Sequence, residues 1–316
     1  MSRYLDPKTD ITFKRVFADP DGKERCVSLL NALLPLGPGR EVVDIEHLPN
    51  ELLPVIKTFK NTIADVRCRD NLGRQFIVEM QMEWTSDFMT RILLNASKAY
   101  ISQFDLGKPY EPSGTVYSLN FINDIFDRKP GSEEAYYHHY AIYEREHPEN
   151  RIEGIEFVLV ELPKFKPGRD LAHTMRRLWL RFLTEIRGNT EMVPPDLVAD
   201  RTLKAAVACL ERSAYTREEL LGYDKYWDVI RTANTLIAGK FKEGRAKGRA
   251  EGLMEGEAKG RAEKQAEHDA KTRETARTLK AAGVPVKIIS AATGLSHGEI
   301  EGLDRSNVNQ AAPTSV

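Results

Sequence analysis

The chain has 316 residues, of which 41% are hydrophobic and 29% are charged, and its formal net charge is −1. This composition is typical of a globular protein with a filled core. The near-neutral charge excludes a protein drawn onto nucleic acid by its overall field, so any DNA contact must use basic residues gathered locally.

Membrane and disulfide-rich classes are also disfavoured. No stretch has the roughly eighteen consecutive apolar residues of a membrane span, and the first residues lack the apolar core of a signal peptide. The three cysteines (Cys26, Cys68 and Cys209) form no Cys-x-x-Cys pair, which argues against a disulfide framework or a zinc knuckle. We therefore expect a cytoplasmic protein.

The first part of the chain predicts two helices and a pair of strands. Phe13 and Phe17 are four residues apart, as on one face of a helix, and Thr9 or Asp10 can cap that helix. The expected elements are helices over 10–17 and 26–34 and strands over 63–69 and 74–81, with a turn composition over 70–73.

The following part predicts more helices than strands. The expected elements are a helix over 88–105, strands over 116–125 and 155–162, and helices over 171–186, 197–212 and 223–241. This order predicts a mixed α/β domain that ends near residue 240.

Residues 241–274 have a different composition. Glycine recurs every four residues among Lys, Arg, Glu and Ala, at Gly244, Gly248, Gly252, Gly256 and Gly260. A glycine inside a helix costs about 1 kcal/mol relative to alanine, which favours a flexible spacer. The alternative is a helix that pairs with another copy of the chain, because small side chains allow close contact between helices. The dense charge excludes a membrane role for these Gly-x-x-x-Gly steps.

Residues 275–305 predict a small module with a helix-turn-helix outline. Gly283 ends one helix, Pro285 starts the next, and Ser296-x-x-Glu299 is a capping box. The segment in the place of a recognition helix, residues 297–304, is acidic, so phosphates repel it. We expect an interaction or oligomerisation module rather than a DNA reader, followed by a disordered tail over 306–316.

The predicted hairpin carries the residues of chemical interest. Asp65 and Glu79 are fourteen apart, which centres their pairing on Leu72 in the turn. This register places six apolar or small residues on one face, because side chains alternate along a strand. These six are the pairs Ala64–Met80, Val66–Val78 and Cys68–Phe76. The opposite face then gathers Asp65, Glu79 and Gln81 beside Ile63 and Ile77, and a one-residue slip would destroy this sorting.

Two neighbouring carboxylates repel each other unless a cation lies between them. A hard divalent ion such as Mg²⁺ prefers oxygen ligands and retains waters. It would hold a phosphate and lower the pKa of an attacking water, with Gln81 orienting that water or a phosphate oxygen. Spacing alone is equally compatible with ordinary carboxylates on a solvated strand face.

The arrangement Asp65-x(13)-Glu79-x-Gln81 resembles the signature of PD-(D/E)XK nucleases, with Gln81 where many members carry lysine. Further similarities are Asp10-x-x-Phe-Lys14-x-x-Phe, residues 91–110, the Gly-x-x-x-Gly run and the terminal Ala-Thr-Gly-Leu-Ser-x-x-Glu-Ile. Together they resemble the recombination-promoting nuclease (Rpn)/putative transposase family. The resemblance implies an α/β fold, with a restriction-endonuclease-like mixed sheet flanked by helices and a C-terminal helical extension. It also implies a Mg²⁺-dependent DNA endonuclease linked to recombination or mobile elements.

By the same resemblance, Asp65, Glu79 and the backbone carbonyl of Met80 are metal ligands, and Gln81 and Asp10 belong to the catalytic set. Asp10 is equally well interpreted as a helix cap. Lys14 is a candidate for the role of the missing lysine, although a solvated helix position is the better explanation of this residue.

DNA contact is expected to use local basic residues, although charged helix faces are usually just solvated. The candidates are Lys14, Arg67, Arg69 and Arg74 near the hairpin, and Arg176, Arg177 and Arg181 on a later helix. The adjacent His138 and His139 diverge in regular structure and so do not share a metal. Two alternatives to a nuclease stay open: a catalytically weak or inactive DNA- or partner-binding protein on a nuclease fold, and a multimeric scaffold built on the glycine-spaced segment.

Overall fold

The computed structural model describes residues 3–52, 62–104, 111–168 and 174–303. The chain divides into two compact units, Met1–Val229 and Ile230–Val316, and each is described by itself. None of the described helices combines the length and hydrophobicity needed to cross a membrane.

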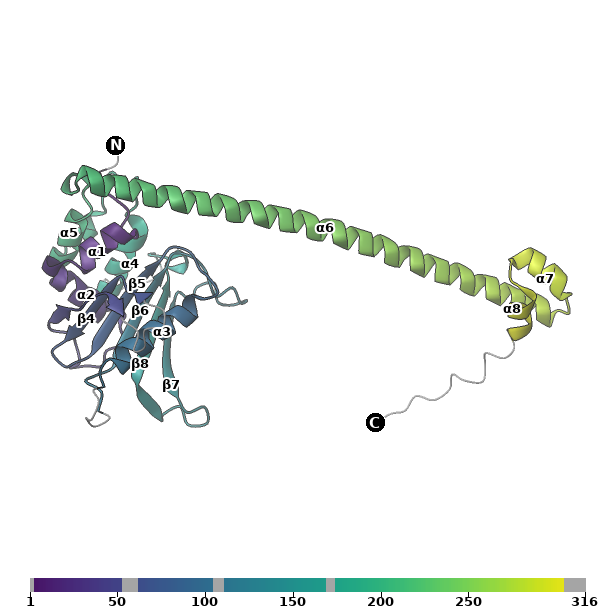
Figure 1. Cartoon of the computed structure of the whole chain (residues 1–316), viewed down its shortest axis with the longest axis horizontal. Coiled ribbons are helices and arrows are strands. Elements are labelled where there is room, and N and C mark those ends of the chain that lie inside the picture. The colour runs from purple at the N-terminus through teal and green to yellow at the C-terminus, as the bar shows by residue number, and fades with distance from the viewer. Residues whose placement is uncertain (1–2, 53–61, 105–110, 169–173, 304–316) are drawn as a thin grey trace. The chain divides into compact units, whose positions relative to one another are not determined.

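A six-stranded mixed sheet forms the centre of the first unit, in the order β1-β4-β5-β6-β8-β7 (Figure 1). The pairs β5/β6 and β6/β8 are parallel, and the outer pairs β1/β4, β4/β5 and β7/β8 are antiparallel. The strands are β1 (Ile45–His47), β4 (Val66–Asp70), β5 (Gln75–Gln81), β6 (Val116–Ile122), β7 (Tyr137–Tyr143) and β8 (Arg151–Glu161). A separate two-stranded sheet pairs β2 (Glu51–Leu52) with β3 (Thr62–Ile63).

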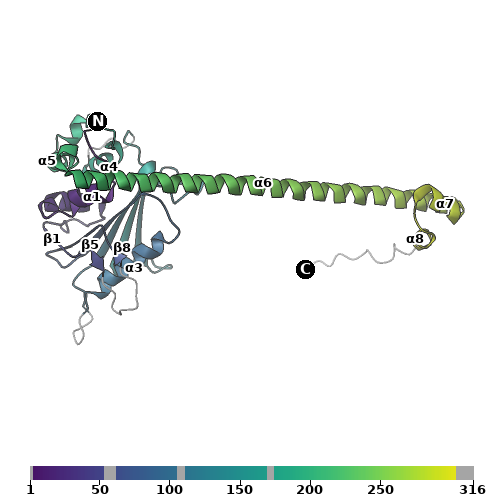
Figure 2. The same cartoon turned by 45° about the horizontal axis from the view of Figure 1, so that its top comes forward.

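Helices cover both faces of the six-stranded sheet, as Figures 1 and 2 show. One face packs against α1 (Asp10–Phe17), α2 (Lys23–Leu33), α4 (Met175–Glu185) and α5 (Arg201–Ala208). The other face packs against α3 (Phe88–Ile101). Short 3-10 helices occupy Pro20–Gly22, Leu162–Lys164, Pro195–Leu197 and Arg212–Ala214. This arrangement confirms the predicted mixed sheet flanked by helices.

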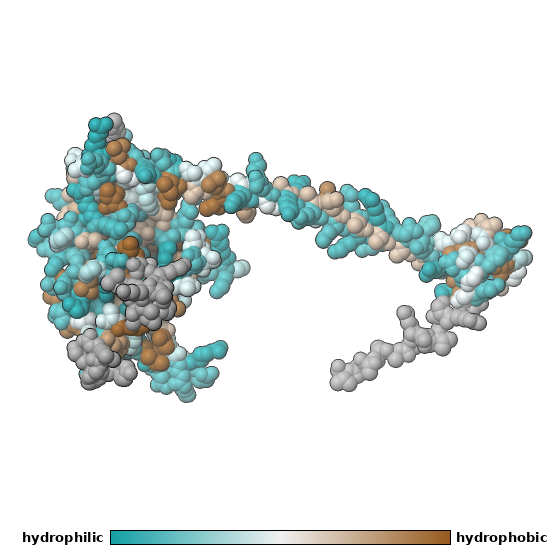
Figure 3. Space-filling model, in the orientation of Figure 1, coloured by the Kyte–Doolittle hydropathy of each residue, from teal (hydrophilic) through white to brown (hydrophobic). Residues whose placement is uncertain are grey.

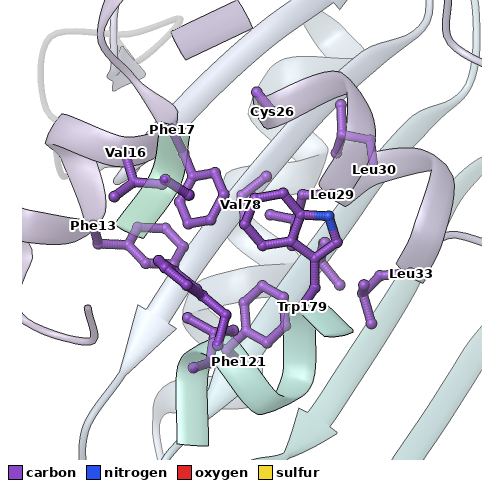
Figure 4. Close-up of a cluster of buried hydrophobic side chains, with 14 of the residues drawn as sticks. Phe13, Val16, Phe17, Cys26, Leu29, Leu30, Leu33, Val78, Phe121 and Trp179 are labelled. Atoms are coloured by element: carbon purple, nitrogen blue, oxygen red, sulfur yellow. The ribbon is translucent and has the colours of Figure 1, made fainter. Parts of the chain in front are cut away.

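The main core lies between the sheet and α1, α2, α4 and α5 (Figure 4). Phe13 and Phe17, the pair that predicted the first helix, are both fully buried. Their ring centroids are 4.9 Å apart, and that of Phe17 lies 5.4 Å from the Trp179 ring. Tilted aromatic pairs at these distances are favourable beyond their burial, so the Phe17–Trp179 contact fixes α1 against α4.

Several boundaries differ from those predicted. The predicted strand over 155–162 begins earlier, at Arg151, and the strand over 116–125 ends at Ile122. β7 was not predicted, because this edge strand has no buried face that would show as alternation in the sequence. The end of the helix predicted over 88–105 and the start of that over 171–186 lie partly outside the described residues.

A long helix, α6 (Arg217–Ala281), covers the glycine-spaced segment. Its first turns belong to the first unit, where Leu220, Tyr223 and Trp227 pack with Leu5 and Ile11. In the second unit the side chains of α6 are largely exposed up to residue 275.

The second unit has a small core of its own. Ala276, Ile289, Ile300 and Leu303 are buried together by the end of α6, α7 (Val286–Thr293) and α8 (His297–Gly302). The predicted capping box is confirmed, because Ser296 accepts from the Glu299 amide while the Glu299 side chain accepts from the Ser296 amide. The predicted tail over 306–316 lies outside the described residues.

Candidate active site

The β4–β5 hairpin has the register that the spacing of Asp65 and Glu79 predicted. Val66 pairs with Val78 and Cys68 with Phe76, and all four are fully buried in the main core. The opposite face of β5 therefore points toward α3.

Two neighbours of the carboxylate pair were predicted wrongly. The chain bends at Asp65 and enters β4 only at Val66. Ala64 therefore packs with Ile77 on the α3 side instead of lining the face of Val66. Ile63 lies in β3 and is 67% exposed, away from the site.

The backbone of Met80 holds Asp65 in place. The Met80 amide donates to Asp65 Oδ2 over 2.8 Å. By contrast, the backbone of Gln75 and of Gln81 forms hydrogen bonds on the β6 side. The Gln75 amide donates to the Thr115 carbonyl, and the Gln81 carbonyl accepts from the Asn123 amide. Because a strand residue directs its N–H and C=O to the same neighbour, the Met80 carbonyl points to the Asp65 side. The Asp65 carboxylate and the Met80 carbonyl oxygen therefore lie on the same side of β5.

Glu79 is the buried member of the pair. Its side chain is on β5, only 7% exposed, and its Oε1 accepts from Asn95 Nδ2 on α3 over 3.1 Å. The Asn95 side chain is itself buried, and its Oδ1 has no hydrogen-bond partner. An unpartnered buried acceptor is costly, so the Asn95 Oδ1 atom beside Glu79 is a place where a further polar or charged partner would stabilise the fold.

Burial and mutual repulsion shape the electrostatics of the pair. Burial, and then the charge of Asp65, raise the pKa of Glu79 from 4.5 to about 8. Burial also raises the pKa of Asp65, helped by Asp10 and opposed by the Met80 amide, Lys14 and Arg91. Desolvation and a like charge both disfavour the ionised form. The groups around Glu79 therefore do not keep this carboxyl group ionised at neutral pH.

The donor set fits a hard divalent cation. In the described part of the chain no three His, Cys, Asp or Glu side chains converge on one metal position. Asp65, Glu79 and the Met80 carbonyl nevertheless offer three oxygen donors, and Mg²⁺ is commonly bound by one or two carboxylates while retaining waters. The two buried carboxyl groups and the unpartnered Asn95 oxygen beside them fit a cation of this kind.

Gln81 lies at the end of β5 and contacts Arg91 of α3. Its Oε1 accepts from the Arg91 guanidinium, and its Nε2 donates to the Glu83 carbonyl over 2.8 Å. Sequence reasoning assigned no role to Arg91 or Asn95. Their four-residue spacing places both on one face of the helix, but the spacing does not show that this face meets β5.

Asp10 and Lys14 form an ion pair over 2.6 Å on α1. The N-cap residue of α1 is Thr9, which makes no side-chain cap bond, so the interpretation of Asp10 as a cap was wrong. Both charges still act on Asp65, since Asp10 raises its pKa and Lys14 lowers it. The start of α1 therefore borders the site.

Tyr226, near the start of α6, was another residue that sequence reasoning did not consider. Burial raises its pKa to about 12, and the charges of Asp10, Asp6, Asp65 and Glu83 add to this shift. Its hydroxyl therefore stays protonated at the acidic edge of the site, as a hydrogen-bond donor.

The three hairpin arginines differ in what holds them. Arg74 is only 3% exposed, and its guanidinium binds Asp70 and the Arg40 carbonyl, so its charge is paired within the fold. Arg67 donates to Gln75 over 3.0 Å, and Arg69 is an exposed residue paired with Glu46 over 3.0 Å. A DNA contact by any of the three stays a prediction, and Arg69 has the most exposed side chain.

Two of the three arginines of α4 make contacts within the protein. Arg176 donates to the Ala32 carbonyl and covers the Tyr137 ring, and Arg181 pairs with Glu185 and Asp196. The Nε of Arg177 is buried. Arg176 and Arg181 therefore make contacts within the fold, and a DNA contact by the α4 arginines stays a prediction.

The two adjacent histidines of β7 diverge, as predicted. His138 binds Glu161 over 2.9 Å and His139 binds Glu156 over 2.7 Å. They therefore do not share a metal.

Comparison with known families identifies the fold. A family model described as PD-(D/E)XK nuclease family transposase matches residues 7–238, which include the sheet, α1 to α5 and every residue of the site. Neither the comparison with curated proteins nor that with solved structures found a match. Nucleases with this fold generally use divalent metal ions, and the family links the chain to mobile elements. The chain belongs to the PD-(D/E)XK nuclease family transposase group.

Proposed function

We propose that the protein is a Mg²⁺-dependent DNA endonuclease that hydrolyses phosphodiester bonds, with a role in recombination or the movement of mobile elements. The observation that carries this proposal is the pair Asp65 and Glu79, two buried carboxylates with raised pKa values beside the Met80 carbonyl. A cation between two buried carboxyl groups favours the ionised form of both.

Each residue has a distinct part in this proposal. Asp65, Glu79 and the Met80 carbonyl hold the cation, which when bound supplies an activated water and neutralises phosphate charge. The Met80 amide orients Asp65, and Asn95 orients Glu79. Supporting partners of this kind fix the direction of metal ligands. Asp10 and Tyr226 border the site, where Tyr226 donates a hydrogen bond to a phosphate oxygen.

The direct test is nicking of supercoiled plasmid with and without Mg²⁺. We expect nicking only with Mg²⁺, and Asp65→Asn, which keeps the side-chain shape, should lower the rate at least about 10²-fold. Asp44→Asn is the matched control, because Asp44 is an exposed carboxylate outside the site. Equal nicking by wild type and Asp65→Asn would overturn the proposal. DNA binding without cleavage would favour the alternative, an inactive DNA-binding protein on this fold.

We also propose that residues 241–305 join copies of the chain, with 1–240 as the nuclease-like domain. Phe241, Leu253 and Met254 are exposed hydrophobic residues of this segment on α6, and Figure 3 shows brown and pale brown side chains along this helix among teal ones. None of the five spaced glycines has a neighbour near its Cβ position, so a second helix can approach closely. Removing residues 241–316 should lower the mass measured in solution to that of one shortened chain; an unchanged oligomer would contradict this role.

A further inference from the structure

We propose that Arg91, held in place by Gln81, supplies the positive charge that lysine supplies in many PD-(D/E)XK nucleases. This inference rests on the proposed phosphodiester hydrolysis and names the group that contacts the scissile phosphate. Arg91 is a catalytic residue in this proposal, and Gln81 is a positioning residue.

The first support is that α3 and β5 meet at matched spacings. Asn95 binds Glu79 and Arg91 binds Gln81. Four residues of a helix advance about 6 Å, and two residues of a strand advance about 6.6 Å. The two contacts are therefore successive steps of one interface, with α3 running opposite to β5. The packing of α3 that places Asn95 beside the Glu79 carboxylate therefore also places Arg91 beside Gln81.

The second support is that the charge of Arg91 is not neutralised. Its guanidinium bonds to a neutral amide oxygen and lies 5.0 Å from the centroid of the Phe88 ring. Among the described residues, no carboxylate lies within ion-pair distance of Arg91. Its charge nevertheless acts on Asp65 and Glu79, because it lowers the pKa of both.

The other basic residues near the site are less suitable. Lys14 is bound to Asp10 over 2.6 Å, Arg69 to Glu46, and Arg74 is buried with Asp70. Arg67 is oriented toward Gln75 and Ser102, at the far end of α3 from Arg91. Arg91 is thus the cation that the fold directs toward Glu79 and Gln81.

Arginine is well suited to this task. The guanidinium is always charged and presents five N–H donors in a plane. Gln81 occupies only part of this fork, so other N–H groups can donate to a non-bridging phosphate oxygen. A donor fixed where charge develops stabilises the transition state without reorganising. A lysine at position 81 would place a second cation against Arg91, which gives a physical reason for the glutamine.

The test removes the positive charge of Arg91 and, in a double variant, introduces a lysine at position 81. Four proteins are compared: wild type, Arg91→Gln, the double variant Gln81→Lys/Arg91→Gln, and Arg145→Gln, which removes an exposed arginine outside the site. Two properties are measured: the single-turnover cleavage rate with Mg²⁺, and the salt dependence of binding to a short DNA duplex with Ca²⁺ in place of Mg²⁺. Thermal melting and calorimetric titration with Mg²⁺ check that each protein is folded and binds the metal.

We expect Arg91→Gln to cleave about 10²- to 10³-fold more slowly, the usual effect of removing one such donor. The slope of log affinity against log salt should fall by about 0.9, the value for one phosphate contact. The double variant should recover most of the rate and of the slope, and Arg145→Gln should match wild type. Wild-type rate and slope in Arg91→Gln would overturn the inference, as would a folded, metal-binding double variant no better than Arg91→Gln.

Adding the Asp65→Asn variant of the plasmid test to this comparison separates the two proposals. If Asp65→Asn is inactive and Arg91→Gln is fully active, the nuclease proposal stands and the assignment of Arg91 fails. If Asp65→Asn cleaves like wild type, the nuclease proposal fails. The salt slope then still decides whether Arg91 contacts phosphate.

Discussion

At the scale of single residues, Glu79 is the most informative side chain of the site. It is almost fully buried, has one side-chain donor in Asn95, and has a pKa raised to about 8. A cation and a proton therefore compete for the same oxygens, because metal ligands must be deprotonated.

This competition predicts a pH-dependent metal affinity. Below pH 8 the folded, metal-free protein holds a proton on Glu79, so Mg²⁺ binding at pH 7 should release about one proton. Release should vanish near pH 9, where Glu79 is already ionised, and the affinity should fall as the pH drops below 8. Calorimetry in two buffers of different ionisation enthalpy measures the released protons.

Glu79→Gln is the control for this experiment, since glutamine cannot titrate. It should bind Mg²⁺ more weakly and release no proton from position 79. Equal proton release by wild type and Glu79→Gln would show that another group titrates.

At the scale of elements, the β4–β5 turn sets the register that brings Asp65 to Glu79. Gly73 in this turn has a φ of +77°, and a Cβ there would lie 2.4 Å from the Ser113 carbonyl oxygen. Both the backbone conformation and the close approach require glycine.

Gly73→Ala should therefore destabilise the protein by at least about 2 kcal/mol, measured as the free energy of unfolding in urea. Gly39→Ala is a matched control, because Gly39 has a φ of +75° but no atom near the Cβ position. The two variants share the backbone strain and differ in the contact with Ser113. Equal decreases in the free energy of unfolding would contradict a cost from the close approach to Ser113.

The hairpin also shows what the sequence could predict. Its register followed from the alternation of Val66, Cys68, Phe76 and Val78, since only one pairing buries all four. Ala64 could not be placed in this way, because the bend at Asp65 leaves no mark in the hydrophobic pattern. Secondary structure with a buried face was predictable, and the bend that orients the carboxylate was not.

Arg91 and Asn95 are a second part of the site that the sequence could not predict. Their positions on α3 were predictable, and so was the face of β5 that holds Glu79. Which residues of the two elements meet depends on how α3 packs on the sheet, through Phe88, Ile92 and Ala96. That packing is a tertiary property, and no local spacing encodes it.

At the scale of the whole molecule, two cores are built from separate parts of the chain. The core of the second unit uses Ala276, Ile289, Ile300 and Leu303, and that of the nuclease-like unit lies within residues 1–229. Units with separate cores unfold separately.

Ile289→Ala should therefore unfold the small helical module and leave the first unit intact. A buried isoleucine truncated to alanine costs about 2–5 kcal/mol, a large share for so small a core. Scanning calorimetry should show the main transition at the wild-type temperature and no separate transition of the helical module. Ile288→Ala is the matched control, because Ile288 is 58% exposed. A downward shift of the main transition in Ile289→Ala would contradict the independence of the two cores.

The central claim is that Asp65, Glu79 and the Met80 carbonyl form a divalent cation site. The most direct measurement is an anomalous difference map from crystals soaked in Mn²⁺, which takes the same oxygen ligands as Mg²⁺. We predict a peak about 2.0–2.4 Å from one oxygen of each of the three groups, lost in Asp65→Asn. A well-ordered site with no peak, or a peak held by other residues, would contradict the account.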